Sequence, residues 1–307
     1  MQNTPRKGLL AKRIYKTREL YFFLIPAVVF YILFKYWPIY GLQIAFRDFS
    51  PVFGFWKSQW VGFANFQRFF RAADWFRLIR NTLSISMTSL VIGFPVPIIL
   101  AILLHHTARK AFKRTVQMVT YAPYFISSVV LVGMLYVLFS PSTGIVNILL
   151  GHLGIGPFFF MGRNEYFVRM YAGSGIWQGA GWSAVVYMAA LSGVNPELHE
   201  SALIDGANKI QRIWYVDIPS ILPAIVTMFL LQVGHLFSVG FDKVYLMQNP
   251  LNLSASEVIS TFTYKRGILD GDFSYSTAIG FMESSINFAL LALFNRLAKW
   301  ISGSGLW

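Results

Sequence analysis

The sequence predicts an all-α, polytopic membrane protein with six transmembrane helices. Hydrophobic residues make up 55% of the 307 positions and charged residues only 13%, which is far from the composition of a soluble domain. The charges also cluster, so that long uncharged stretches alternate with short basic segments. About 20 apolar residues are enough for a helix to cross a bilayer. We therefore expect spans at about residues 20–42, 81–104, 116–139, 170–193, 218–241 and 276–299.

The segments that flank the first span indicate its orientation. Residues 1–19 carry several bases and no acid before Glu19, which is typical of a cytoplasmic tail. The first apolar stretch has no small-residue cleavage site, so we expect a retained helix and not a signal peptide. A cluster of four bases between Arg109 and Arg114 follows the second span and supports a cytoplasmic side there. Six spans then return the C-terminal tail, residues 301–307, to the cytoplasm.

Proline, glycine and aromatic residues shape the remaining elements. Pro95 and Pro97 predict a kink in the second span. Residues 43–80 form a long aromatic and basic outer loop, and residues 65–77 place phenylalanines on one helical side, as in a helix lying in the membrane interface. No Asp, Glu, Lys or Arg occurs between residues 115 and 162, but Pro141 and the glycines after it end the predicted third span at about residue 139.

The sequence lacks the residue patterns that metal binding, nucleotide binding and catalysis require. There is no cysteine, and the histidines, at positions 105, 106, 152, 199 and 235, show no ligand spacing, so we expect no metal site. No G-x-x-x-x-G-K-[ST] motif and no serine, histidine and acid arrangement is present, so we predict that the chain is not an enzyme and binds no cofactor itself. The formal charge of +13 is explained by basic flanks of membrane helices, and no nucleic-acid partner is expected.

Residues 195–219 form a polar segment between the fourth and fifth spans. Asn195-Pro196-Glu197 is typical of a helix start, with Asn as N-cap and Pro in the first turn. Gly206 is placed to end that short helix in the left-handed conformation. A second amphipathic turn follows, and Pro219 marks the return to apolar sequence. The segment is predicted to be a helix-turn-helix on the membrane surface.

This segment resembles the EAA loop of ABC importer permeases. Glu200-Ser201-Ala202 is followed by three residues, Gly206, nine residues and the run from Val216 to Pro219, which is similar to the pattern E-A-A-x3-G-x9-I-x-L-P. Ser201, Val216 and Ile218 depart from the pattern, but each roughly keeps the size of the usual residue. The alternative is an amphipathic connector that has a glycine at this position by chance.

The resemblance extends over nearly the whole chain. Asp205-Gly206-Ala207 is similar to the sugar-importer branch, and residues 21–70 are similar to the polysaccharide-type, LplB-like permeases within the maltose-type group. The resemblance implies the type I ABC importer permease fold. It also implies that the coupling to an ATPase is carried by Glu200, Ser201, Ala202, Asp205, Gly206 and Pro219.

The same resemblance implies the partners and the location. We expect a second homologous permease subunit, two ATPase subunits that bind ATP and Mg, an extracytoplasmic solute-binding protein, an oligosaccharide and membrane lipids. The chain would lie in the bacterial cytoplasmic membrane with both termini in the cytoplasm. Residues 195–217 hold four acids and two bases, which suits an ATPase surface with exposed arginines.

Polar side chains within the predicted spans are the candidates for a substrate passage. Aromatic rings stack on sugar rings and amides bind hydroxyl groups, so the predicted set on the fourth and fifth spans is Gln178, Trp182, Tyr187, Gln232 and His235. Ordinary hydrogen bonding and packing between helices explain each of them better when it is taken singly, so the passage hypothesis concerns the five residues as a group. The repeated glycines between residues 173 and 181 predict close helix packing.

Two isolated charges fall within predicted spans. Lys35 and Glu283 both lie near the expected outer side, so we predict an ion pair between them, although a buried acid is also a candidate for function. An ion-gradient-driven secondary transporter is the alternative to an ABC importer, and it would need such intramembrane acids, of which only Glu283 qualifies. A membrane scaffold is a second alternative, but neither class explains the spaced Glu, Gly and Pro.

The charge of the predicted outer loops indicates the charge of the substrate. They are rich in bases, which favour an anionic sugar such as an alginate- or pectin-derived oligomer; the alternative for the group from Arg68 to Arg80 is contact with anionic lipid headgroups. The outer bases are Arg47, Lys57, Arg68, Arg71, Arg77, Arg80, Arg163, Lys265 and Arg266.

Overall fold

Helices build almost the whole molecule. The computed structural model describes residues 17–303 and 305–307. The long helical segments are α2 (Arg18–Tyr31) with η1 (Ile32–Tyr36) and η2 (Trp37–Phe46), α5 (Trp75–Gly93) with α6 (Pro95–His105), α7 (Lys110–Tyr121) with η3 (Ala122–Phe125), α8 (Ser128–Leu138), α10 (Asn164–Ser192), α13 (Ile218–Val233) and α17 (Phe273–Ser302). Most of the predicted cytoplasmic tail, residues 1–16, lies outside the described residues.

Short elements connect these helices. They are α3 (Gly54–Lys57), α4 (Ala64–Arg71), α9 (Ile145–His152), α11 (Pro196–Ile204), α12 (Lys209–Arg212), η4 (Ile213–Asp217), α14 (Phe241–Met247), α15 (Leu253–Ser256), α16 (Ile259–Tyr264) and η5 (Lys265–Leu269). Strands β1 (Arg47–Asp48) and β2 (Gln59–Trp60) pair antiparallel, with Arg47 opposite Trp60. This two-stranded ribbon leaves the all-α architecture unchanged.

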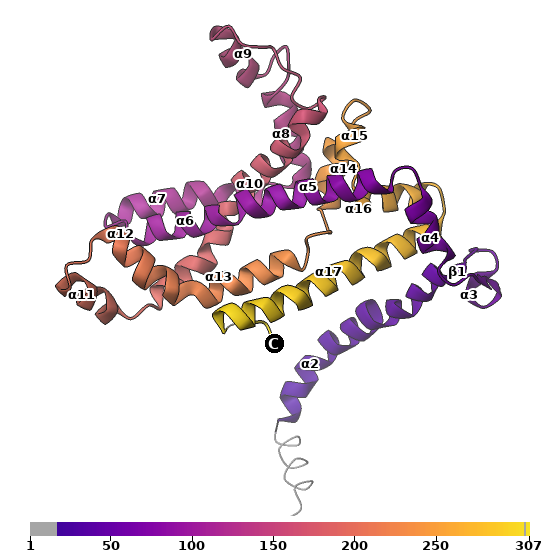
Figure 1. Ribbon diagram of the computed structural model, residues 1–307, viewed down its shortest axis with the longest axis horizontal. Helices are drawn as coiled ribbons and strands as arrows, with labels where there is room; N and C mark the ends of the chain where they lie inside the picture. The colour runs from indigo at the N-terminus through magenta and orange to yellow at the C-terminus, as the bar shows by residue number, and fades with distance from the viewer. Residues whose placement is uncertain (1–16, 304) are drawn as a thin grey trace, which may run out of the picture.

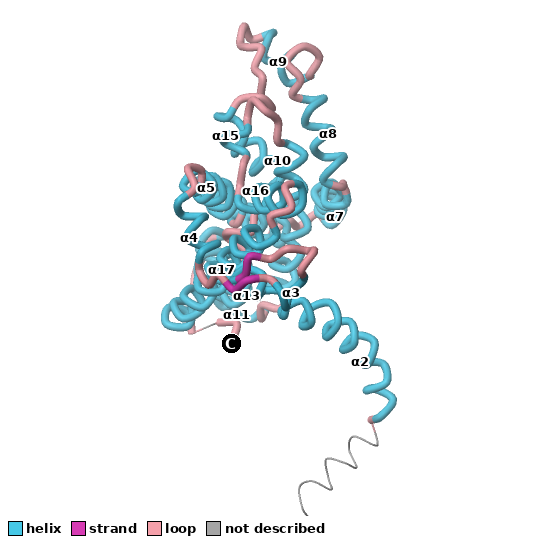
Figure 2. Tube along the Cα trace, turned by 90° about the vertical axis from the view of Figure 1, so that its right-hand side faces the viewer, coloured by secondary structure: helices cyan, strands magenta, loops and turns pink. Residues whose placement is uncertain are grey.

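Several of the long helices lie along the longest axis of the molecule (Figure 1). Helices α5, α13 and α17 run along it, with α11 and α12 at one end and the β-ribbon at the other. Helix α10 is the central element, because it packs against α5, α6, α7 and α13. Figures 1 and 2 both show α8 and α9 projecting from one side of this bundle and α2 leaving it on another.

Composition and length confirm a membrane protein. Four helical segments of the described chain are long and apolar enough to cross a membrane, namely Tyr21–Phe46, Trp75–His105, Lys209–Val233 and Phe273–Ile301. A bent pair, Lys110–Phe125 with Ser128–Leu138, gives a fifth. Helix α10 is long enough at 29 residues, but glycines and serines lower its hydropathy, so it is absent from this group. These segments are compatible with the predicted six spans.

The third predicted span, 116–139, needs correction because the chain bends by 102° within it. Ile126 adopts an extended conformation, and the Ser127 hydroxyl accepts a hydrogen bond from the Val130 amide at 3.3 Å, which starts a new helix, α8. A serine N-cap satisfies an amide that an interrupted helix would leave unpaired. Hydropathy alone does not detect such a cap inside an apolar stretch.

The fifth predicted span, 218–241, is shifted toward the N-terminus, because the apolar helical segment is Lys209–Val233. Helix α13 ends at Val233. The Phe237 amide then donates to Asn287 Oδ1 of α17 at 2.9 Å, so the Asn287 side chain accepts the bond that a further turn of helix would have made.

The close helix packing predicted from the repeated glycines is confirmed at Gly181 of α10, where an added Cβ would lie 2.0 Å from the Thr120 carbonyl oxygen. Gly179, by contrast, faces open space.

Candidate functional site

The polar segment between α10 and α13 forms two short helices joined by a tight turn. The Asn195 side chain accepts a hydrogen bond from the Glu197 amide at 3.1 Å, so the predicted N-cap of α11 is confirmed. A capping box starts α12, with Asn208 and Gln211 exchanging hydrogen bonds of 2.8 and 3.0 Å. Each cap satisfies amides that the start of a helix leaves unpaired. The sequence therefore sets the two helix starts locally.

Gly206 ends α11 in the left-handed conformation, with φ +80°. The Ala207 amide donates to the Ala202 carbonyl at 2.8 Å, and the Gly206 amide donates to the Leu203 carbonyl at 3.0 Å. This pair of bonds is the Schellman motif, which needs a residue that tolerates positive φ. The predicted left-handed cap is confirmed, and it fixes the direction in which the chain leaves α11.

Helix α11 presents a mixed apolar and acidic surface. Glu200, Ser201 and Asp205 are exposed and Ala202 is half-buried. Ile204 is 87% exposed and Leu203 54%, and Figure 1 places α11 outside the bundle at one end of the molecule. Exposed apolar side chains on a protruding helix are typical of an interaction surface. Pro219, also exposed, lies in the first turn of α13.

Asp217 is not part of that surface. Its side chain is fully buried, and its Oδ2 lies 2.7 Å from His106 Nε2 while its Oδ1 lies 3.2 Å from His199 Nε2. The acidic docking surface expected from residues 195–217 therefore consists of Glu197, Glu200 and Asp205. The sequence did not reveal this cluster, because His106 lies 111 residues before Asp217 along the chain.

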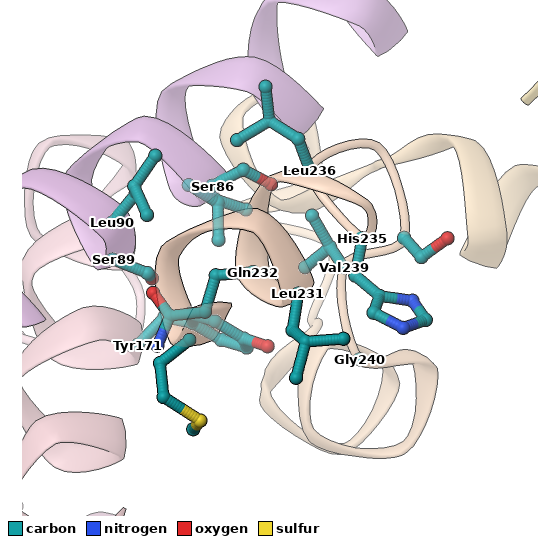
Figure 3. Close-up of a pocket in the computed structure, with 13 residues that line it drawn as sticks. Ser86, Ser89, Leu90, Tyr171, Leu231, Gln232, His235, Leu236, Val239 and Gly240 are labelled. Carbon is teal, nitrogen blue, oxygen red and sulfur yellow. The ribbon is translucent and has the colours of Figure 1, made fainter. Parts of the chain in front are cut away.

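Two adjoining cavities of about 440 Å³ each lie between α5, α10 and α13. Figure 3 shows the first, in which Ser86 and Ser89 come from α5, Tyr171 from α10, and Gln232 from α13. The second cavity shares Gln232 and Tyr171 with the first and adds Gln178, among others. Of the five predicted passage residues, Gln178, Gln232 and His235 thus line these cavities.

The other two predicted passage residues lie elsewhere. Tyr187 is only 2% exposed and packs in a core cluster with Leu191 and Ile221, so its role in the passage is not supported by the geometry. Trp182 stacks on Tyr124 with ring centroids 4.8 Å apart and lines neither cavity. A helical stripe of polar and aromatic residues does not distinguish the packed face of α10 from the face on a cavity.

Lys243 lines the second cavity, and the sequence analysis missed it. Its Nζ donates to the Tyr171 carbonyl at 2.9 Å and lies 4.6 Å from the centre of the Tyr171 ring. The side chain is buried and has no acidic partner within the described chain. The feature of the sequence that could have indicated Lys243 is the isolated pair of charges Asp242-Lys243, which follows the fifth apolar stretch.

The predicted ion pair between Lys35 and Glu283 is absent. Glu283 Oε1 accepts a hydrogen bond from the Ser238 hydroxyl at 2.9 Å, and Ser238 also accepts from Asn287 Nδ2 at 2.9 Å. Lys35 lies on η1, fully within the first helical segment, and is exposed. The η2 part of that segment packs against α17, whereas α2 leaves the bundle (Figure 1), and Lys35 on η1 between them makes no ion pair with Glu283.

Many of the outer bases are already paired. Arg68 lies 2.6 Å from Asp272, and Glu257 lies 3.4 Å from Arg77 and 2.9 Å from Lys265. Arg266 pairs with Asp270, and Arg47 donates to two backbone carbonyls. Within the described residues, the outer bases without an acidic partner or a side-chain hydrogen bond are Lys57, Arg71, Arg80 and Arg163.

The fold and the protruding helix define an integral membrane protein of the importer-permease class. The family model described as the binding-protein-dependent transport system inner membrane component matches residues 93–303. The chain belongs to this family of transport permeases, which places it in the cytoplasmic membrane as a multi-pass protein. It is a transport component.

Individual relatives cover nearly the whole chain. Protein LplB of Bacillus subtilis is 39% identical over 95% of this chain and 92% of its own length. The polygalacturonan/rhamnogalacturonan transport system permease protein YteP of the same organism is 38% identical over 98% of this chain and 94% of its own. A chain in the crystal structure of a bacterial alginate ABC transporter, in complex with an alginate pentasaccharide-bound periplasmic protein, superposes with a TM-score of 0.88 at 34% identity, covering 96% of this chain and 99% of that one.

Proposed function

We propose that this chain is a membrane-spanning subunit of an ATP-driven importer of oligosaccharides. The observation that carries the proposal is α11, a capped and exposed helix that lies outside the bundle between α10 and α13. Two ATPase subunits would bind ATP and Mg in the cytoplasm, a second permease of similar fold would complete the passage, and a solute-binding protein would deliver the sugar. Both termini of this chain would face the cytoplasm.

In this mechanism α11 acts as a lever. Its exposed Leu203 and Ile204 would enter an apolar cleft of the ATPase, and Glu197, Glu200 and Asp205 would face bases on the rim of that cleft. Closure of the ATP-bound dimer would then displace α11 and, through its short connections, the adjoining helices α10 and α13. The cavities between α5, α10 and α13 would open to one side of the membrane at a time.

The geometry of the cavities suits a sugar. Gln178 and Gln232 supply amide donors and acceptors, and Ser86 and Ser89 supply hydroxyl groups around the same space. Neutral polar side chains of this kind exchange hydrogen bonds with sugar hydroxyls without holding a fixed charge in the passage. The wall of the second cavity also carries a buried base, Lys243, and an acid, Asp242.

We further propose that the oligosaccharide is acidic. Two of the relatives support this, since YteP is named for polygalacturonan and rhamnogalacturonan, and the alginate transporter structure contains an alginate oligomer. The outer bases without an acidic partner, among them Arg71, Arg80 and Arg163, leave positive charge available for steering an anionic sugar. Lipid headgroups are the competing ligand for the bases near the interface.

The decisive experiment purifies the chain with its ATPase and measures ATP hydrolysis in lipid nanodiscs. We expect hydrolysis to rise when the cognate binding protein is added with an oligosaccharide, and failure of any ATPase to copurify would contradict the importer proposal. Matched uronate and neutral oligomers then test the substrate class. Stimulation by neutral oligomers alone would contradict the acidic substrate and leave the importer proposal intact.

A further inference from the structure

Three histidines surround one buried aspartate where α6, α11 and α13 meet. Asp217 has no exposed surface, and its two carboxylate oxygens face His106 and His199 at 2.7 and 3.2 Å. His105 closes the group, because its ring lies 6.5 Å from that of His199. One ligand atom each from His105, His199 and Asp217 lies within 4.8 Å of the other two. Two imidazoles and a carboxylate therefore converge on one small volume.

The cluster contains polar atoms without a hydrogen-bond partner. Asp217 Oδ1 and His199 Nε2 are both buried, and neither makes a hydrogen bond of acceptable geometry although they are close to each other. A buried carboxylate is costly unless a positive group compensates it. Only its other oxygen is bonded, by His106. A cation bound by Asp217 Oδ1 and His199 Nε2 would give both of these buried atoms a partner.

We propose that His105, His199 and Asp217 bind a zinc ion. Zinc prefers imidazole nitrogen and carboxylate oxygen in a tetrahedral arrangement, whereas calcium and magnesium select oxygen ligands alone. Ligand distances of about 2.0–2.1 Å place tetrahedral ligand atoms about 3.3 Å apart, so side-chain rotation brings the present group into range. A water molecule would fill the fourth position.

His106 completes the site without binding the metal. Its Nε2 is 2.7 Å from Asp217 Oδ2, so it fixes the carboxylate and leaves Oδ1 to point at the two other histidines. Hydrogen bonds to a ligating carboxylate orient it, and their loss commonly lowers metal affinity by about 10- to 100-fold. His106 is accordingly a positioning residue.

The location gives the site a consequence. His105 ends α6, His199 lies on α11, and Asp217 directly precedes α13. A bound zinc ion would therefore join the protruding helix to the ends of two bundle helices and restrict its movement. This inference concerns the chain alone and does not depend on the proposed transport function.

The test measures zinc on the full chain, purified in detergent with a tag that contains no histidine. After removal of metal with a chelator, the protein is incubated with zinc chloride, desalted and analysed by mass spectrometry for metal content. We expect about one zinc per chain for the wild type, and an at least tenfold lower zinc content in both His105→Ala and His199→Ala. His152→Ala is the control, because His152 bonds only the Ile148 carbonyl of its own helix.

Two results would overturn the proposal. Absence of zinc from the wild-type chain at micromolar concentrations would show that the cluster is only a hydrogen-bonded network, and equal retention by the wild type and both variants would show binding elsewhere on the surface. Gel filtration checks that the variants are monodisperse. If His199→Ala fails to fold, cobalt is added to the metal-free wild-type chain instead. Tetrahedral cobalt with imidazole ligands absorbs visible light, so we expect this absorption to appear. Its absence would contradict the site.

Discussion

Replacing Gly206 by valine tests whether the left-handed turn after α11 is needed for coupling. The glycine has φ +80°, and nothing lies within 4 Å of an added Cβ, so the effect of a side chain comes from backbone strain and not from a clash. The left-handed conformation costs an L-residue about 1–2 kcal/mol, and more for a β-branched side chain. Relief of that strain breaks the hydrogen bonds of Ala207 and Gly206 to the last turn of the helix.

A penalty of about 1–2 kcal/mol changes the population of the capped helix by about 5- to 30-fold. Because α11 is exposed and makes few contacts with the bundle, we expect unchanged expression and thermal stability of the chain. We expect the ATPase activity of the assembled complex, stimulated by binding protein and sugar, to fall about tenfold. Gly206→Asn should fall less, since asparagine tolerates the left-handed region.

Gly193→Ala is the matched control at the other end of the same connection. Gly193 follows α10 with φ −90°, and its added Cβ would lie 3.5 Å from the Ala190 carbonyl, an ordinary contact. Its stimulated ATPase activity should stay at the wild-type level. If Gly206→Val assembled normally and retained wild-type stimulation, the argument that this turn positions the coupling helix would be wrong.

Two further substitutions test packing inside the bundle. Gly181→Ala should destabilise the chain by about 1–3 kcal/mol, seen as a lower melting temperature in detergent, because its Cβ would meet the Thr120 carbonyl at 2.0 Å. Ser238→Ala and Glu283→Gln should be non-additive in the free energy of unfolding, because the Ser238 hydroxyl donates to the Glu283 carboxylate at 2.9 Å.

Both tests have a matched control: Gly179 on the same helix for Gly181, and the predicted Lys35–Glu283 pair for Ser238 and Glu283. Gly179→Ala should leave the free energy of unfolding within about 0.5 kcal/mol of the wild type, since nothing lies within 4 Å of an added Cβ at Gly179. An equal loss of stability at both glycines would contradict the close crossing at Gly181. Lys35→Ala combined with Glu283→Gln should be additive. A coupling free energy between Lys35 and Glu283 in this double-mutant cycle would contradict the structure, because it would indicate an ion pair between them.

Sequence patterns predicted the helix ends on the surface segment because those ends are local. Asn195, Pro196 and Gly206 act on amides and carbonyls within a few residues, so their spacing is sufficient to predict the caps. The same holds for Pro219 in the first turn of α13. The spaced Glu, Gly and Pro also indicated the family that the comparison with known proteins shows.

Contacts between distant segments were beyond the reach of such patterns. Tyr187 and Gln178 lie on one polar and aromatic helix, yet Tyr187 is packed in the core and Gln178 faces a cavity. Which face of α10 is covered depends on where α6 and α13 cross it. The bend at Ser127 likewise follows from one serine hydroxyl inside an apolar stretch whose mean hydropathy predicted a continuous helix.

What the sequence by itself determined is the membrane-protein class, the capped surface helix and the family, because apolar length and local hydrogen bonding leave direct marks along the chain. What only the tertiary structure decided is how separated residues meet. Glu283 pairs with Ser238 and not with Lys35, because the first helical segment packs on α17 through η2 while its α2 part leaves the bundle. Asp217 lies beside His106 and His199 because the ends of α6, α11 and α13 converge, and hydropathy carries no information on that convergence.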